Sequence, residues 1–188
     1  MRIITGKAKG IMLKTLEGEA TRPTASRVKE AVFSMIQFDI EGRSVLDLFA
    51  GSGQMALEAL SRGASNATFV DRSKEAIAVI KSNIEKTKFT DISSVYQSDY
   101  LDYIKRFGGK QFDIIFLDPP YALKMYRPAL KALLENNMIK STTLIVCESS
   151  EDAIFDGDTV LEAKFYIEKQ SKYSKTYINI FKLKDEDN

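Results

Sequence analysis

A chain of 188 residues, 44% of them hydrophobic, is long enough for one domain with a substantial core and too short for two full domains. A net charge of +1 excludes a global field that would attract a polyanion, so any contact with nucleic acid must be local. The absence of histidine excludes a Ser-His-Asp triad, a Cys-His pair and histidine-ligated zinc, and a single cysteine excludes an internal disulfide.

The sequence has the features of a cytosolic protein. Met1–Gly6 lacks a secretory hydrophobic region, and no stretch approaches the roughly 18 apolar residues of a membrane span. One cysteine fits a reducing compartment, and Cys147 stands in an apolar run where a buried side chain is a better interpretation than a nucleophile. We therefore expect a cytoplasmic monomer that binds neither a membrane nor a metal.

Residues 1–40 predict a small extension. Arg2–Thr5 and Ile11–Lys14 flank Gly6–Gly10, which is the pattern of a β-hairpin. An amphipathic helix follows, and its inward side chains are predicted to be Val28, Ala31, Val32, Met35 and Ile36.

Residues 41–184 predict a doubly wound α/β domain, because apolar runs alternate with helical patterns and so form a parallel sheet covered on both faces. In the second helix, Ser73 is placed to cap, and Ile77, Ile80 and Ile84 share one face. The predicted strands are 44–49, 66–70, 92–97, 112–117 and 142–148, and the predicted helices are 53–62, 73–87, 99–107 and 127–136.

The C-terminal part predicts an antiparallel hairpin. Two strand-like runs, 160–168 and 175–182, are joined by 169–174 with no helix between them. The whole pattern predicts a mostly parallel, seven-stranded Rossmann-like sheet. Residues 185–188 are expected to form a disordered tail.

A glycine loop follows the first predicted strand, in Asp47–Gly53. Asp71 ends the second strand 20 residues after Gly51, and Asp99 follows the third, so three strand ends converge on a crevice that fits a nucleoside. Gly51–Ala56 also fits the dinucleotide pattern G-x-G-x-x-G/A, and a glycine pair after a strand can be a tight turn only. Asp47 favours a cationic ligand, such as the amino-acid part of S-adenosylmethionine (AdoMet), because it would repel a pyrophosphate.

The fourth predicted strand ends in Asp118-Pro-Pro-Tyr121. Neither proline has an N–H, so this turn presents acceptors, and Tyr121 adds a flat face on which a base can stack. Acceptors that hold the hydrogens of an exocyclic amine can direct its lone pair at a methyl donor. Such chemistry requires neither histidine nor metal.

The motifs "VLDLFAGSG" and "DPPY" resemble those of Rossmann-type, AdoMet-dependent methyltransferases that modify amino groups of adenine or guanine. The segments "RIITGKAKG", "TRPTASRVKEAVF" and "ALEALSRGA" are similar to the bacterial RsmD family of 16S ribosomal RNA guanine-N2 methyltransferases, over almost the whole chain. The resemblance implies AdoMet as cofactor, bound by Asp47, Phe49, Ala50, Gly51 and Gly53 at its methionine part, Asp71 at its ribose, and Asp99 and Tyr100 at its adenine, with Arg72 as a further cofactor-binding residue. It also implies that the target guanine is bound by Asp118, Pro119, Pro120 and Tyr121.

The basic residues of the N-terminal segment predict the surface that meets RNA. Residues 1–31 hold seven positive and three negative side chains, which leaves +4 in a chain of net +1. The expected partner is 16S ribosomal RNA, free or within a partly assembled small ribosomal subunit, gripped through its phosphates. The expected RNA-binding residues are Arg2, Lys7, Lys9, Lys14, Arg22, Arg27 and Lys29, with Lys124 and Arg127 beyond the Asp-Pro-Pro-Tyr turn.

Three alternatives remain open from the sequence. The Asp-Pro-Pro-Tyr motif alone also fits an adenine-N6 methyltransferase acting on DNA or RNA. The glycine loop also fits an NAD-dependent oxidoreductase, although that function leaves the Asp-Pro-Pro-Tyr turn without a role. The third alternative is a non-catalytic RNA-binding module that retains a cofactor pocket.

Overall fold

The computed structural model describes residues 1–16, 23–119, 125–149, 154–155, 157–173 and 176–184, without the side chains of residues 23–26. The predicted tail, residues 185–188, lies outside the described residues.

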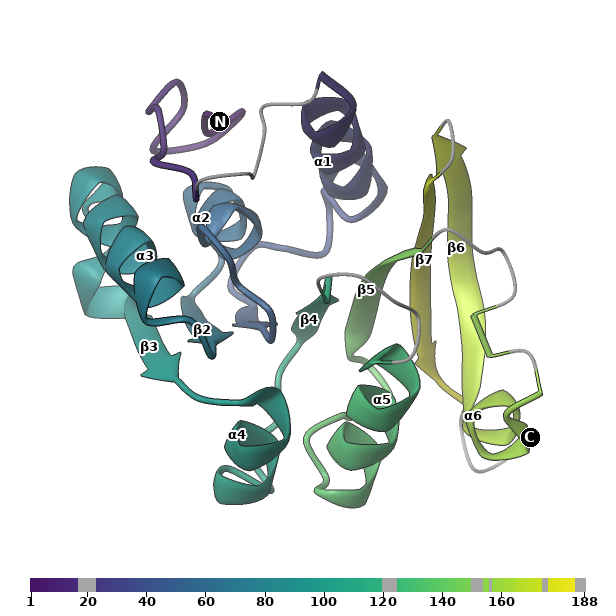
Figure 1. Ribbon diagram of the computed structural model, residues 1–188. Coiled ribbons are helices and arrows are strands. Elements are labelled where there is room, and N and C mark those ends of the chain that lie inside the picture. Colours follow the sequence, from purple (N-terminus) through teal and green to yellow (C-terminus); the bar gives the residue numbers. More distant parts are fainter. Residues whose placement is uncertain (17–22, 120–124, 150–153, 156, 174–175, 185–188) are drawn as a thin grey trace.

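A seven-stranded sheet forms the centre of the molecule, in the order β3-β2-β1-β4-β5-β7-β6 (Figure 1). The first five strands of that order pair in parallel, and the last two pair antiparallel. The predicted Rossmann-like sheet with an antiparallel C-terminal hairpin is therefore confirmed. The strands are β1 (Ser44–Asp47), β2 (Asn66–Asp71), β3 (Ser93–Gln97), β4 (Ile114–Leu117), β5 (Leu144–Ser149), β6 (Phe165–Tyr173) and β7 (Thr176–Leu183).

Helices cover both faces of the sheet. They are α1 (Pro23–Met35), α2 (Gln54–Ser61), α3 (Lys74–Thr87), α4 (Tyr100–Arg106), α5 (Tyr126–Glu135) and α6 (Thr159–Lys164), with a 3₁₀ turn η1 at Thr90–Ile92. Side chains of α1, α2 and α3 pack in one core, and side chains of α4, α5 and α6 pack in the other. No helix among the described residues is long and apolar enough to cross a bilayer.

The predicted helix faces are confirmed. Val28, Ala31, Val32 and Ile36 are buried and Met35 packs against them, while Ile77, Ile80 and Ile84 are buried on α3. The Ser73 side chain accepts a hydrogen bond from the Ala76 amide, as an N-cap residue does.

Alternation along the strands decides which core each side chain enters. Val45, Phe116 and Val146 belong to the core beneath α1, α2 and α3, while their neighbours Leu46 and Ile115 belong to the other core. A residue two positions after Val45, Phe116 or Val146 in the same extended strand therefore points toward the sheet face that α1, α2 and α3 cover.

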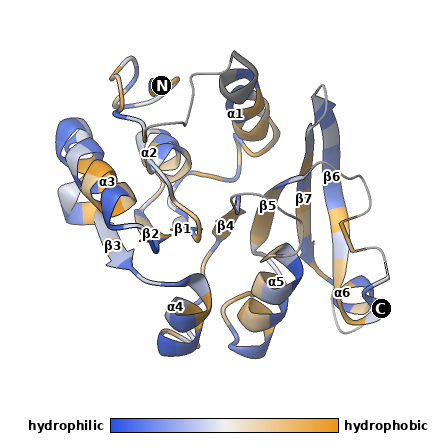
Figure 2. Ribbon diagram, viewed as in Figure 1, coloured by the Kyte–Doolittle hydropathy of each residue, from blue (hydrophilic) through white to orange (hydrophobic). Residues whose placement is uncertain are grey.

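The C-terminal hairpin begins later than the sequence predicted. Residues 160–164, predicted as strand, belong to α6, where the Asp158 side chain caps the helix and Leu161 is buried. Residues 169–173, predicted as the connection, are paired with β7 as part of β6. Figure 2 shows that this upper part of β6 is hydrophilic. The propensity-based prediction failed because main-chain pairing can hold a polar strand at the edge of a sheet.

The N-terminal hairpin is confirmed as a short antiparallel bridge that is docked against α2. Arg2 pairs with Met12, and the Ile3 amide donates to the Ile11 carbonyl over 3.0 Å. Gly6 has φ of 87°, and an added Cβ would lie 1.8 Å from the Ser61 carbonyl oxygen, so only glycine fits this contact.

Glu58 of α2 binds the main chain of the N-terminal hairpin. Its fully buried carboxylate accepts hydrogen bonds from the amides of Ile4 (2.8 Å) and Thr5 (3.0 Å). The same carboxylate pairs with Arg62 Nε at 2.9 Å and Lys29 Nζ at 3.2 Å. Four donors on one buried acid fix the hairpin, α1 and α2 relative to each other.

Candidate active site

Four acids follow the ends of four neighbouring parallel strands. Asp47 and Asp71 end β1 and β2, Asp99 follows β3, and Asp118 follows β4. The strand order reverses between β1 and β4, where open α/β sheets bind ligands. A cavity of about 650 Å³ lies at this edge, lined by Leu16, Asp47, Phe49, Ala50, Gly51, Ser52, Gln54, Met55, Asp71, Arg72, Ser73, Ala76, Asp118 and Pro119.

The glycine loop forms the floor of this cavity. Gly53 has φ of 78°, and an added Cβ would lie 3.2 Å from the Phe69 ring, so the tight turn into α2 favours glycine on both counts. The helix α2 begins at Gln54 without a side-chain cap, and of its first amides that of Ala56 donates to Asp47.

Asp71 shapes the loop as well as lining the cavity. Its two carboxylate oxygens accept hydrogen bonds from the amides of Gly51 (2.9 Å) and Ser73 (2.8 Å). Each oxygen retains a lone pair that a hydroxyl group could use.

A second, smaller cavity of about 50 Å³ shares Phe49, Asp71 and Arg72 with the first and also contacts Tyr100 and Asp99. The Asp99 side chain caps α4 through the Leu101 amide, and the rings of Phe49 and Tyr100 lie 5.1 Å apart. The structure thus brings all nine predicted cofactor residues together around two adjoining cavities or, in the case of Gly53, into the loop beneath them.

Asp47 is a buried acid, and no cation among the described residues pairs with it. Burial raises the pKa of Asp47 to about 7, and the carboxylate of Asp118 adds to that shift. Hydrogen bonds from the amides of Ala56 and Phe49 oppose it. A cationic ligand group placed beside Asp47 would relieve this unfavourable charge.

Gln54 is a site residue that the sequence reasoning missed. Its Oε1 atom is buried and accepts no hydrogen bond from the described residues, although it belongs to the lining of the large cavity. A buried acceptor of this kind fits a ligand that carries N–H donors. Its position directly after Gly53 was the only signal in the sequence.

Asp118 lies exposed at the cavity edge, and Pro119 behind it is buried. Pro120 and Tyr121, which the sequence assigned to the target base, lie outside the described residues. The predicted burial of Cys147 is confirmed, and burial raises the pKa of its thiol well above the ordinary value, which does not suit a nucleophile.

Glu148 is a second residue that the sequence reasoning missed. It is the next-to-last residue of β5, half-buried, and adjacent to Asp118 across the β4–β5 pair. Burial raises the pKa of Glu148 to about 8, and the Asp118 carboxylate adds to the shift. Nothing in the sequence places β5 beside β4, so no local signal could have found it.

Asn83 of α3 connects the N-terminal segment to the glycine loop. Its buried amide accepts from the Lys14 amide at 2.8 Å and donates to the carbonyls of Lys14 (3.0 Å) and Ser52 (2.9 Å). The chain that leaves the hairpin is therefore fixed directly against the cavity floor.

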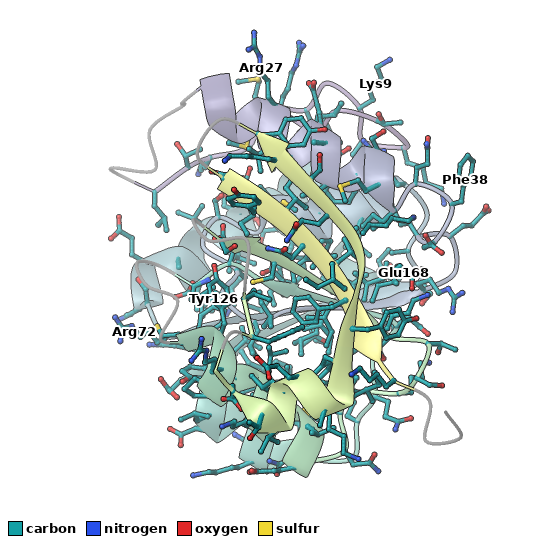
Figure 3. The ribbon with its side chains drawn as sticks, turned by 90° about the vertical axis from the view of Figure 1, so that its right-hand side faces the viewer. Lys9, Arg27, Phe38, Arg72, Tyr126 and Glu168 are labelled. Atoms are coloured by element: carbon teal, nitrogen blue, oxygen red, sulfur yellow. The ribbon has the colours of Figure 1, made fainter. Side chains whose placement is uncertain are left out.

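Most of the predicted RNA-binding cations are on the surface. Figure 3 shows Lys9 and Arg27 pointing outward at one end of the molecule. Arg22 and Lys124 lie outside the described residues, and Arg127 is half-buried. The exposed members of the predicted set are Arg2, Lys7, Lys9, Lys14 and Arg27.

Lys29 was wrongly predicted to meet RNA. It is buried, with Nζ 2.9 Å from the Arg2 carbonyl oxygen in addition to its ion pair with Glu58. Burial lowers the pKa of Lys29, and the neighbouring Glu58 opposes that shift. The side chain is engaged in holding the hairpin and cannot reach a phosphate.

Comparison with known proteins identifies the family. Residues 1–182 match the family described as "Conserved hypothetical protein 95". The chain belongs to this family, the RsmD family that its motifs resemble.

Relatives in the RsmD family cover most of this chain. YlbH of Bacillus subtilis is 37% identical over 97% of this chain and 98% of its own length. "Ribosomal RNA small subunit methyltransferase D" of Haemophilus influenzae is 37% identical over 81% of this chain and 80% of its own length. The solved structure of yhhF from Escherichia coli superposes with a TM-score of 0.85 at 26% identity, covering 98% of both chains.

Proposed function

We propose that this protein transfers a methyl group from AdoMet to the exocyclic N2 amine of one guanine in 16S ribosomal RNA. Relatives from Haemophilus influenzae and Escherichia coli carry the name "Ribosomal RNA small subunit methyltransferase D", which supports methylation of small-subunit RNA. The observation that carries the proposal is the cavity at the sheet edge, where Asp47 is buried near Asp118 and no cation of the described part of the chain neutralises it.

The residues of this cavity fit AdoMet. Asp47 and the Gln54 Oε1 atom suit the positively charged amino-acid end, because both are buried acceptors with capacity to spare. Asp71 suits the ribose hydroxyls, and the rings of Phe49 and Tyr100, which line the smaller cavity, suit contact with the adenine. When bound, AdoMet would supply a methyl group activated by its positively charged sulfur.

Asp118 positions the nucleophile in this account. The guanine N2 lone pair is delocalised into the ring, and a carboxylate that accepts from an N2 hydrogen restores its availability. Bound AdoMet would supply the methyl carbon to N2 and would keep the bonding pair of the broken carbon–sulfur bond, so that neutral S-adenosylhomocysteine would remain. The nitrogen then loses one proton, which Asp118 can accept and pass to water.

Residues 1–40 form the RNA-binding part and residues 41–184 the methyltransferase part of the proposed enzyme. The exposed cations Arg2, Lys7, Lys9, Lys14 and Arg27 suit phosphate contacts that hold RNA without reading its sequence. Their attachment through Glu58 and Asn83 keeps this grip at a fixed distance from the cavity.

The Asp118→Ala variant tests the proposal. Turnover on 16S RNA from cells lacking the protein is expected to fall by about 100-fold or more, because positioning is lost. AdoMet affinity, measured by calorimetry, is expected to stay within about threefold of the wild type, since the cofactor is held mainly by other residues. Asp102→Ala, an exposed acid on α4, is the matched control and should leave both values unchanged. Near-normal turnover in Asp118→Ala would contradict the proposal.

A further inference from the structure

Glu148 lies near the end of β5, close to Asp118 at the same edge of the sheet. The register pairs Leu117 of β4 with Cys147 of β5, so the next residues, Asp118 and Glu148, are lateral neighbours on strands about 4.8 Å apart. Figure 1 shows β4 and β5 side by side, with both strands ending at the same edge of the sheet. Alternation puts Glu148 on the face of Val146, which is also the face of Asp47.

Neighbouring elements hold Glu148 in this position. The Tyr126 hydroxyl of α5 donates a hydrogen bond to the Glu148 carbonyl oxygen, and the main chain pairs with Ile178 of β7 on the other side. The backbone is thus fixed from both directions, while the carboxylate makes no ion pair or hydrogen bond with the described residues. Burial and Asp118 raise the pKa of Glu148 to about 8, and a hydrogen-bond donor placed beside its carboxyl group would lower that pKa and favour the ionised, accepting form.

Two adjacent carboxylates match the Watson–Crick edge of guanine and not that of adenine. Guanine presents the N2 amine beside N1–H, two donors in succession. Adenine presents its N6 amine beside a bare N1 acceptor, which would face a carboxylate oxygen unfavourably. Enzymes that act on an extruded base commonly read this edge through hydrogen bonds.

We propose that Glu148 determines base specificity by accepting a hydrogen bond from N1–H of the target guanine while Asp118 holds the N2 amine. This inference rests on the proposed function and adds the reason why the same site rejects adenine. A buried polar group left unpaired by the wrong substrate discriminates strongly, so one carboxylate suffices for the selection.

The test uses small-subunit RNA in which the target guanine is replaced by 2-aminopurine. This base keeps the 2-amine and lacks N1–H. The wild type is expected to lose about 100-fold in kcat/KM on the replaced RNA. Glu148→Gln is expected to lose about 10-fold or more on guanine but to bring the two substrates within about threefold of each other, because a glutamine amide can donate to the bare N1.

Controls separate this inference from the proposed function. Glu135→Gln, an exposed acid on α5, should keep the wild-type ratio of the two substrates, and unchanged AdoMet affinity shows that each variant is folded. If the wild type methylates both bases equally, or if Glu148→Gln keeps the wild-type ratio, the role of Glu148 is refuted and the proposed function stands. If the wild type methylates no guanine in the RNA, the proposed function itself fails.

Discussion

Glu58 and Asp47 are both carboxylates that the fold removes from water, yet their surroundings are opposite. Glu58 receives two amides, an arginine and a lysine, and with them joins the N-terminal hairpin to the sheet domain. Asp47 has two amides but no cation among the described residues, and the charges of Asp118 and Asp71 raise its pKa further. A neutralised acid serves the fold, whereas an acid that the fold leaves without a cation marks a place for a ligand.

The contacts of Glu58 also keep the proposed RNA-binding surface at a fixed position relative to the proposed methyl-transfer site. The Glu58 cluster fixes the hairpin to α2, whose N-terminus lies at the cavity floor. Asn83 fixes the chain after the hairpin to Ser52 of the same floor. Two independent attachments therefore hold the basic surface against the glycine loop.

Replacing Glu58 by glutamine should have the largest effect on stability, because it removes the charge that neutralises this cluster. The variant leaves the Lys29 ammonium buried without its partner, which costs about 3–5 kcal/mol of unfolding free energy. Denaturant unfolding measures this loss, and AdoMet affinity of the remaining folded protein should be unchanged. Glu85→Gln, an exposed acid on α3, is the control and should shift stability by less than about 0.5 kcal/mol. A loss that small in Glu58→Gln would show that the cluster does not anchor the hairpin.

Replacing Asp47 by asparagine should raise the free energy of unfolding, whereas Glu58→Gln lowers it. The pKa of Asp47 is raised in the folded protein, so between about pH 4 and pH 7 the folded state retains a proton that the unfolded chain has lost. Stability therefore falls as pH rises through this window, by roughly 3–5 kcal/mol for this group.

Asp47→Asn removes that loss, so the variant should match the wild type near pH 4 and exceed it in unfolding free energy by roughly 3–5 kcal/mol at pH 8. AdoMet binding should weaken by about 10- to 100-fold at pH 8, because the cationic ligand loses its partner. Unfolding curves at the two pH values and calorimetry measure both effects. A variant that is less stable at pH 8 and binds AdoMet normally would show that Asp47 stabilises the fold and does not bind AdoMet.

Reversing the charge of two hairpin cations should have a smaller effect, on the salt dependence of RNA binding. Lys7→Glu together with Lys9→Glu should lower the salt dependence of RNA binding by about 1.5 in the slope of log K against log salt. AdoMet affinity should remain unchanged, because neither side chain lines the cavity. Lys105→Glu with Lys110→Glu changes the net charge equally at a distant surface and should leave the slope unaltered. An equal slope in the hairpin variant and the wild type would show that Lys7 and Lys9 do not contact the RNA phosphates.

The sequence predicted the strand-end acids well, for a physical reason. Asp47, Asp71 and Asp118 each interrupt an apolar run, and parallel strands bring their carboxyl ends to one edge whatever their order. Glu148 could not be predicted, because its relation to Asp118 depends on β5 pairing with β4 in one particular register. Local patterns indicate where strands end but not which strands become neighbours.

The errors have the same origin. Lys29 resembles a surface cation in the sequence, and only the packing of α1 against Glu58, 29 positions further on, makes it a buried partner. Residues 169–173 resemble a polar connection, and only their pairing with β7 makes them strand. In both places a contact between distant segments overrode a correct local pattern.

Mass mapping of small-subunit RNA is the most direct test of the central claim that the acids at the sheet edge serve methyl transfer to guanine. RNA is compared from cells without the protein and from the same cells supplied with the wild type or with Asp118→Ala. The account predicts one N2-methylguanosine that is absent without the protein, restored by the wild type and not restored by the variant. An unchanged methylation pattern, or full restoration by Asp118→Ala, would contradict it.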